Sequence, residues 1–375
     1  MVDSRTDRLA RLIVEYSLDL GPGQVLRIDG NAVAEPLLLA AYRHAIERGA
    51  HAYVAPAVDG VVEALLAEGS EAQLTYISPG APAELERLDA LITVWAESNT
   101  RSLSGADPDR QRVMVDARQE LAQRRMQRIF SHELAWCGTL FPTQAHAQDA
   151  QMSLSQYERF VYGACHVLEG DSDPVEHWRG VSHELAARAK ELQAVSLLRI
   201  LGPDTDLRMS VAGRSWIAAD GHRNMPDGEV FTSPVESATQ GEIRYTAPAT
   251  FQGREVEDVR LRFDYGEVVS AEATQGEEYL RQMLAVDGAS VLGEVAFGLN
   301  YEIDRLTGNI LFDEKIGGTM HVALGASFPP TGGTNTSALH WDMICDLRDD
   351  GEVYADGELV WKAGRFLRPP AELES

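Results

Sequence analysis

The chain changes character close to residues 192–195, and this change constrains the fold more than any other feature of the sequence. Before it, segments whose apolar residues have helical spacing alternate with short apolar runs of strand length. After it, short runs of alternating apolar and polar residues are separated by glycine and aspartate turns. We therefore expect two domains, residues 1–193 and 194–375, a number that the chain length also favours.

The first domain is expected to be a doubly wound α/β domain. Its predicted helices cover residues 3–18, 33–48 and 61–69, and its predicted strands are QVLRIDG, HAYVAPAV and LDALITVWA. The last strand is apolar on both sides, which is typical of the interior of a parallel sheet. Helices and strands in series build such a sheet from βα units. No G-x-G-x-x-G follows these strands, so the sequence lacks a dinucleotide-binding fingerprint.

The second domain is expected to be an α+β domain with a mainly antiparallel sheet. Two helical stretches, residues 155–170 and 174–193, precede it and are separated by the break EGDSDP. From Ala194 onward, runs such as SLLRILG, TDLRMSV and GEVYADGELVWKAG alternate with the two-residue period of half-buried strands. Turns at hairpin intervals connect these runs, which favours antiparallel pairing.

Charge and cysteine content restrict the partners and the compartment. A net charge of −25 would repel phosphate backbones and anionic lipids, so we expect neither nucleic acid nor a membrane surface as a partner. Small molecules or peptides, cationic ones above all, fit better. The three cysteines, Cys137, Cys165 and Cys345, form no C-x-x-C pair, which favours a reducing cytoplasm. No signal peptide is recognisable, and no apolar run approaches the roughly 20 residues that span a bilayer.

The stretch SALHWDMICDL places a histidine and an aspartate in an otherwise strand-like apolar run. Residues two positions apart on a strand point to the same side, so His340 and Asp342 share a face. Two interpretations remain open for this H-x-D pair. The two side chains either form a hydrogen-bonded pair in the core or are two ligands of one metal site.

Three further residues of the second domain have metal-ligand chemistry. His321 follows a double glycine in GGTMHVALG, Glu294 lies within the apolar segment ASVLGEVAFGLN, and Glu229 begins a short β run in HRNMPDGEVFTSP. An ionised carboxylate in an apolar segment is costly unless a positive charge neutralises it. Mixed imidazole and carboxylate ligands suit zinc, cobalt or manganese, and several carboxylates with two histidines suit a pair of ions.

Four motifs, in order, resemble those of one enzyme family: NMPDGEVFTSP, LGEVAFGLN, LFDEKIGG followed by HVALG, and SALHWDMICDLR. The chain is similar over essentially its full length to the aminopeptidase T and aminopeptidase S type of metallo-aminopeptidases, the thermophilic metalloprotease family. The resemblance implies an N-terminal α/β domain, a C-terminal domain that carries the metal site, and a homodimer. It also implies two divalent metal ions per chain, held by Glu229, Glu294, His321, His340 and Asp342.

The reaction implied by the resemblance is the hydrolysis of N-terminal residues from short peptides by a metal-activated water. Glu294 or Glu314 would be the catalytic carboxylate that moves the proton. Glu314 lies two residues farther from the histidine than its counterpart in the type members. A second departure is Phe328, since the family's classical members carry a tyrosine seven positions after that histidine. A phenyl ring donates no hydrogen bond, and loss of one oxyanion donor typically costs about 10²–10³ in rate.

Two other functions remain open. His321, His340 and Asp342 have the composition of a two-histidine, one-carboxylate iron site, and ring-opening dihydroxypyridine dioxygenases resemble distant relatives of this family. Those relatives carry a histidine where this chain has Glu294. The other alternative is a metal-dependent peptide-binding protein that lost turnover together with the tyrosine hydroxyl.

Overall fold

The structure is a computed structural model that describes residues 3–251 and 253–370. The chain forms two compact units. The first comprises residues 1–178 and 221–226, and the second comprises residues 179–220 and 227–375. The cut lies inside helix α10 (Pro174–Leu192) rather than after it. The domain boundary expected between residues 193 and 194 therefore stays a prediction.

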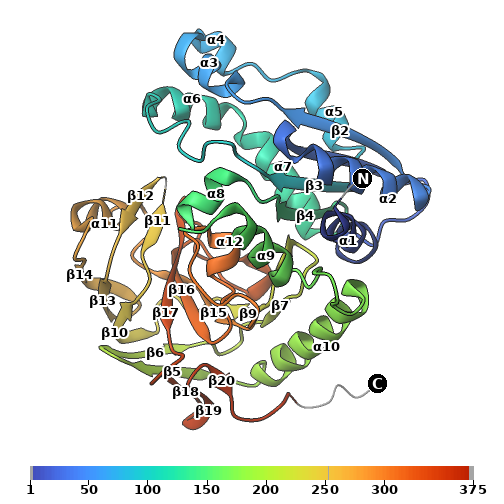
Figure 1. Ribbon diagram of the computed structural model, residues 1–375. Coiled ribbons are helices and arrows are strands. Elements are labelled where there is room, and N and C mark those ends of the chain that lie inside the picture. Colours follow the sequence, from blue (N-terminus) through green and yellow to red (C-terminus); the bar gives the residue numbers. More distant parts are fainter. Residues whose placement is uncertain (1–2, 252, 371–375) are drawn as a thin grey trace. The chain divides into compact units, whose positions relative to one another are not determined.

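The first unit contains a parallel sheet, as the sequence predicts, and the sheet has five strands where the sequence indicated three (Figure 1). The strands are, in spatial order, β2 (His51–Ala57), β1 (Val25–Asn31), β3 (Ala90–Trp95), β4 (Ala135–Leu140) and β8 (Asn224–Met225). All neighbours in this sheet pair in parallel. The order runs outward from β1 in both directions, as in doubly wound sheets. The edge strand β8 comes from beyond residue 194, which the sequence did not indicate.

The helices of the first unit include those predicted at residues 3–18, 33–48, 61–69 and 155–170, while the one predicted at 174–193 is α10. Helix α1 (Ser4–Leu12) begins after Asp3, whose side chain accepts a hydrogen bond from the amide of Arg5, and it continues as a π-helical turn, η1 (Ile13–Ser17). The others are η2 (Ala32–Ala34), α2 (Glu35–Glu47), α3 (Val61–Glu68), α4 (Glu71–Leu74), α5 (Gly80–Leu85), α6 (Pro108–Ala117), α7 (Gln119–Phe130), α8 (Gln144–Asp149) and α9 (Leu154–Ala164). Among the described residues no helix is both long and apolar enough to cross a membrane.

The second unit contains a large antiparallel sheet of eight strands, which confirms the predicted pairing. In spatial order they are β14 (Glu267–Glu272), β13 (Val259–Asp264), β10 (Thr239–Tyr245), β6 (Thr205–Ser210), β5 (Leu197–Gly202), β18 (Glu352–Ala355), β19 (Glu358–Lys362) and β20 (Arg365–Phe366). A separate hairpin joins β11 (Ala249–Phe251) to β12 (Arg254–Val256). In β13 the apolar residues Val259, Leu261 and Phe263 are buried while the intervening residues are exposed, as the two-residue period predicts.

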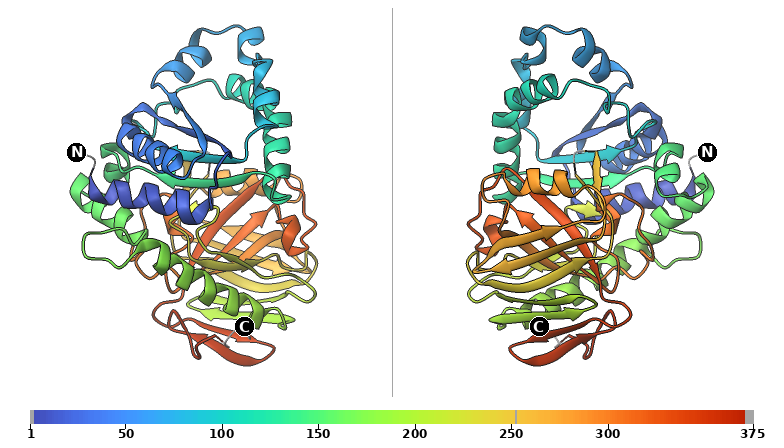
Figure 2. Two further views of the ribbon diagram at one scale, coloured as in Figure 1. Left: turned by 90° about the vertical axis from the view of Figure 1, so that its right-hand side faces the viewer. Right: turned by 90° about the vertical axis from the view of Figure 1, so that its left-hand side faces the viewer.

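A second antiparallel sheet completes this unit. Its strands are β17 (His340–Asp346), β16 (Thr319–Gly325), β15 (Leu292–Gly298), β9 (Glu229–Thr232) and β7 (Ile217–Ala219). One face of this sheet packs into the apolar core that it shares with the larger sheet, and Figure 2 shows the orange strands beside the yellow and green ones. The remaining helices are α11 (Glu277–Leu284), α12 (Ile310–Asp313) and η3 (Pro329–Thr331). The opposite face of the smaller sheet carries the candidate site.

Candidate metal centre

Strands β16 and β17 place three predicted ligands on one face of the smaller sheet. In their antiparallel register Asp342 lies opposite Ala323, and His340 lies opposite Gly325. Directly opposed residues share a face, and so do residues two apart on one strand. His321 is two residues before Ala323 and therefore points to the same side as His340 and Asp342.

Strands β15 and β9 bring the other two predicted ligands to this face. Ala296 lies opposite His321, and Glu294 is two residues before Ala296. Gly298 lies opposite Glu229 across the pairing of β15 with β9. Ala296, Gly298, Ala323 and Gly325 lie opposite or between these ligands, and all four are small. Phe231, opposite Ala296, and Ile344, opposite His321, are the bulky residues on the same face. Four neighbouring strands therefore direct acidic and imidazole side chains to one face of the sheet.

A bulge precedes Glu294. The register between β15 and β16 shifts between Leu292 and Glu294, so Gly293 is an extra residue on its strand. A Cβ atom on Gly293 would lie 2.1 Å from the carbonyl oxygen of Ala326, a contact that no side chain tolerates. Bulges redirect the residues next to them, and this bulge sets the direction of the Glu294 carboxylate.

Main-chain hydrogen bonds fix the orientation of both histidines. Nδ1 of His321 lies 2.9 Å from the carbonyl oxygen of Glu314, and Nδ1 of His340 lies 2.8 Å from the carbonyl oxygen of Ala326. A carbonyl oxygen only accepts, so Nδ1 carries the hydrogen in each ring. The Nε2 atoms face the carboxylates instead. Metal-binding histidines in proteins are commonly held in this way.

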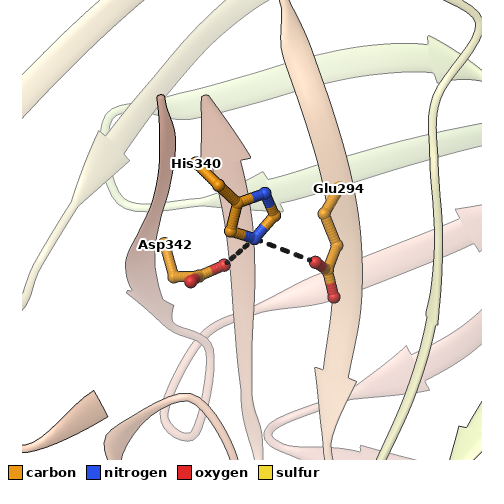
Figure 3. A group of neighbouring side chains, drawn as sticks. All are labelled: Glu294, His340 and Asp342. Carbon is orange, nitrogen blue, oxygen red and sulfur yellow. Dashed lines mark ion pairs between the residues drawn. The ribbon is translucent and has the colours of Figure 1, made fainter. Parts of the chain in front are cut away.

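The Glu294 carboxylate lies between the two imidazoles. Its Oε1 is 3.3 Å from Nε2 of His321, and its Oε2 is 3.3 Å from Nε2 of His340. Oδ1 of Asp342 lies 3.2 Å from the same nitrogen of His340. Figure 3 shows the His340 ring between the carboxylates of Asp342 and Glu294. On the other side, Oε2 of Glu229 lies 3.7 Å from Nε2 of His321. The five side chains thus form two adjoining groups that share Glu294.

The donor atoms of these groups fit divalent cations. Glu294 is only 4% exposed, and Glu229 and His321 are buried as well. Among the described residues, Oε2 of Glu229 and Oδ1 of Asp342 are buried without a hydrogen-bond partner. Buried carboxylate oxygens are costly unless they are neutralised or bonded. Ligand atoms of Glu294, His340 and Asp342 all lie within 4.8 Å of one another, close enough to surround one ion.

The titration of these groups reflects a strong negative potential. Burial opposes protonation of both imidazoles, but the surrounding carboxylates raise the pKa of His321 to about 10 and that of His340 to about 12. Burial also raises the pKa of the Glu229 carboxyl well above its usual value, with help from the charges of Glu314 and Glu294. Against its burial, the charge of His340 lowers the pKa of Asp342 to about 2. The site attracts positive charge from protons or metal ions.

Lys315 is a member of the site that the sequence did not indicate. It is 0% exposed, and its Nζ lies 3.9 Å from Oδ1 of Asp227 and 4.0 Å from Oε1 of Glu229. It also donates to the carboxylate of Glu314. Burial disfavours its charge, but the Glu314 and Glu229 carboxylates more than compensate and raise the pKa of Lys315 above its ordinary value. Nothing in the sequence of the segment DEKIGG indicates that its lysine is buried.

Glu314 and Phe328 both border the ligands. Glu314 caps the C-terminal end of α12, and burial raises the pKa of its carboxyl above the ordinary value. Its charge also interacts with those of Asp342 and His321. The ring of Phe328 packs edge-on against the imidazole of His340, with 5.0 Å between centroids, and against Phe231 at 5.4 Å. The residue that departs from the family pattern is therefore in contact with a predicted ligand.

Comparison with known proteins agrees with the four motifs. Residues 2–366 match the family model described as thermophilic metalloprotease (M29). Aminopeptidase 2 of Geobacillus stearothermophilus is 28% identical over 97% of this chain and 98% of that protein. Aminopeptidase AmpS of Bacillus subtilis is 25% identical over 97% of this chain and 100% of that protein. Aminopeptidase T of Thermus thermophilus is 31% identical over 52% of this chain and 55% of its own length.

Two solved structures share the fold. Wild-type AmpT from Thermus thermophilus has a TM-score of 0.85 at 23% identity and covers 97% of this chain and 99% of its own. A 2,5-dihydroxypyridine dioxygenase from Pseudomonas putida has a TM-score of 0.59 at 14% identity and covers 97% of each chain. The predicted family and the predicted enzyme class, a peptide hydrolase, are both confirmed by the family match and the curated relatives. The chain belongs to the thermophilic metalloprotease (M29) family.

Proposed function

We propose that this protein is a metal-dependent aminopeptidase that removes N-terminal residues from short peptides with two divalent ions per chain. Membership of a metalloprotease family and full-length relatives named aminopeptidases support the reaction. The observation that carries the two-ion assignment is the position of Glu294, whose two oxygens face two different histidines. A carboxylate in that position is suited to bridge a pair of ions.

The two groups around Glu294 define which residues would hold each ion. His321, Glu229 and Oε1 of Glu294 would hold one, and His340, Asp342 and Oε2 of Glu294 the other. The charge balance supports a pair of ions. Without counting Asp227, the site has four carboxylates, those of Glu229, Glu294, Glu314 and Asp342, and one ammonium, that of Lys315. The net charge of these groups is three negative charges, which is more than one divalent ion neutralises. Zinc, cobalt or manganese suits these ligands.

When bound, such ions lower the pKa of a water towards neutrality and polarise the scissile carbonyl. The carboxylate of Glu314 would accept the proton and return it to the leaving amine. Burial raises the pKa of its carboxyl above the ordinary value, which favours a proton acceptor, while the charge of Lys315 opposes that rise. Both oxygens of Glu294 already face histidines, so Glu314 is the better placed base.

The two alternatives are less well supported. The dioxygenase has a similar fold, but at 14% identity this likeness concerns the fold alone. Glu294 lies at the centre of the site, where a two-histidine, one-carboxylate iron centre has no use for a second carboxylate. Binding without turnover rests on Phe328 alone, and membership of a metalloprotease family favours hydrolysis.

The decisive assay uses metal-depleted protein reloaded in turn with zinc, cobalt, manganese or iron. We expect release of free amino acid from dipeptides and amino-acid anilides with at least one of the first three ions, and loss of release in His340→Ala. His51→Ala, which changes an exposed histidine of the first unit, is the matched control and should retain activity. Equal release by wild type and His340→Ala, or no release with any ion, would reject the peptidase assignment.

The homodimer and the cytoplasmic location remain predictions. Sedimentation equilibrium tests the first, since a dimer has twice the chain mass of 41.1 kDa. A species at the chain mass throughout the micromolar range would contradict it.

A further inference from the structure

A cavity of about 220 Å³ opens beside the metal centre. Its walls come from three separate segments of the second unit: β11 with the residues just before it, the turn and helix at Gly308–Asp313, and β17. His340 and Asp342 form part of its lining. The cavity therefore adjoins the group of ligands around His340.

The face of β17 that carries the ligands continues into the cavity. His340, Asp342 and Ile344 are successive alternate residues of this strand and share one face. Ile344 and Ala249 are buried and form apolar parts of the wall. Ile310 also lines the cavity but is 47% exposed, which places it at the rim. An apolar ligand that entered the cavity would cover part of this isoleucine.

The charges in the cavity wall disfavour a ligand with an acidic side chain. No lysine or arginine is among the described residues that line the cavity. The carboxylate of Asp313 accepts hydrogen bonds from the amides of Thr307 and Gly308, each at 2.8 Å, and is held within its own turn. An acidic ligand side chain would meet the carboxylate of Asp313, and no lysine or arginine among these lining residues would offset the repulsion. An apolar side chain would instead gain about 25 cal/mol for each Å² that it buries.

We propose that this cavity receives the side chain of the N-terminal residue of the substrate and selects apolar side chains of the size of leucine or phenylalanine. The proposal rests on the proposed aminopeptidase function. The released residue must lie with its amine and carbonyl at the ions, so its side chain starts within a few bonds of His340 and Asp342. A cavity of about 150 Å³ already holds a benzene ring, and this one is larger.

The test measures kcat/KM for a series of amino-acid anilides that differ only in the N-terminal side chain. Wild type should favour leucine and phenylalanine anilides over those of glycine and glutamate. Ile310→Ala should lower the leucine-to-alanine ratio about tenfold, the effect of losing a small apolar contact in a specificity pocket. Ile46→Ala removes an isoleucine of nearly equal exposure, 49%, from α2 of the first unit and should leave the ratio unchanged.

A second variant fills the cavity. Ala249→Leu should reduce turnover of the phenylalanine anilide while that of the alanine anilide is retained, a reversal that general misfolding would not produce. An unchanged ratio in Ile310→Ala, in an enzyme that still hydrolyses anilides, overturns the assignment of the cavity and leaves the aminopeptidase function intact. The assignment of the cavity is also overturned if Ile310→Ala alters only the preference for the second residue of dipeptides. Failure of wild type to hydrolyse any substrate overturns both.

Discussion

His321 donates its Nδ1–H to the main-chain carbonyl of Glu314 across 2.9 Å. The main-chain carbonyl of Glu314 therefore orients His321, a predicted metal ligand, while the side chain of Glu314 is the proposed general base. The next residue, Lys315, carries a buried ammonium that donates to the Glu314 carboxylate. The side chain of Lys315 reaches back towards Glu229 on β9. Positioning of ligand and base is thus linked through one segment, DEKIGG.

Removing the buried charge of Lys315 should destabilise the protein. Lys315→Met leaves the buried carboxylates of Glu229 and Glu314 without their cation, and breaking such a pair typically costs about 3–5 kcal/mol. Urea unfolding in the presence of a chelator measures the change. Lys362→Met is the control, because its pair with Glu352 is exposed and its loss should barely change stability. Equal stability of Lys315→Met and wild type would contradict the role of this lysine.

Restoring a hydroxyl at position 328 should maintain or raise the rate. The Phe328 ring lies against His340, so a tyrosine there would bring a hydrogen-bond donor to the edge of the site. We expect Phe328→Tyr to have equal or higher kcat, with a gain of at most about 10²–10³, the usual contribution of one oxyanion donor. Steady-state kinetics on a dipeptide provides the measurement, with Phe231→Tyr as a control at the neighbouring ring. A collapse of activity in Phe328→Tyr would refute the donor argument.

A methyl group at the bulge before Glu294 should disable the site. Gly293→Ala places a Cβ 2.1 Å from the Ala326 carbonyl, so β15 must shift and carry the Glu294 carboxylate with it. Reduced metal affinity in titration calorimetry and a lower melting temperature are expected together. Gly180→Ala provides the comparison: nothing lies within 4 Å of its added Cβ and it is inside α10, where alanine favours the helix. Wild-type metal affinity in Gly293→Ala would show that the bulge does not position Glu294.

The sequence predicted what depends on local periodicity and on motif order. The helices and strands of βα units and hairpins carry clear periods, and the four motifs identified the family before the structure brought the five side chains together. Strand β8 escaped prediction because two residues have no period and its pairing with β4 joins distant parts of the chain. Lys315 escaped it because burial of a turn lysine depends on tertiary neighbours.

Burial of both faces of β15 and β16 explains why the sequence did not show what surrounds Glu294 and His321. Every residue of β15 and β16 is buried, so these strands lack the alternation that marks their neighbours. Glu294 was recognisable because a charged side chain is costly in such a run, and His321 because it follows a double glycine within a family motif. Which partner offsets that cost could not be read from the sequence, since the partners come from four strands.

Anomalous diffraction from crystals grown with zinc or cobalt would locate the ions directly. We expect two peaks about 3.5–4 Å apart, with the Glu294 carboxylate between them. The histidine nitrogens and carboxylate oxygens should lie about 2.0–2.2 Å from the ions. A single peak beside His340 and Asp342, or peaks bound by other residues, would contradict this expectation.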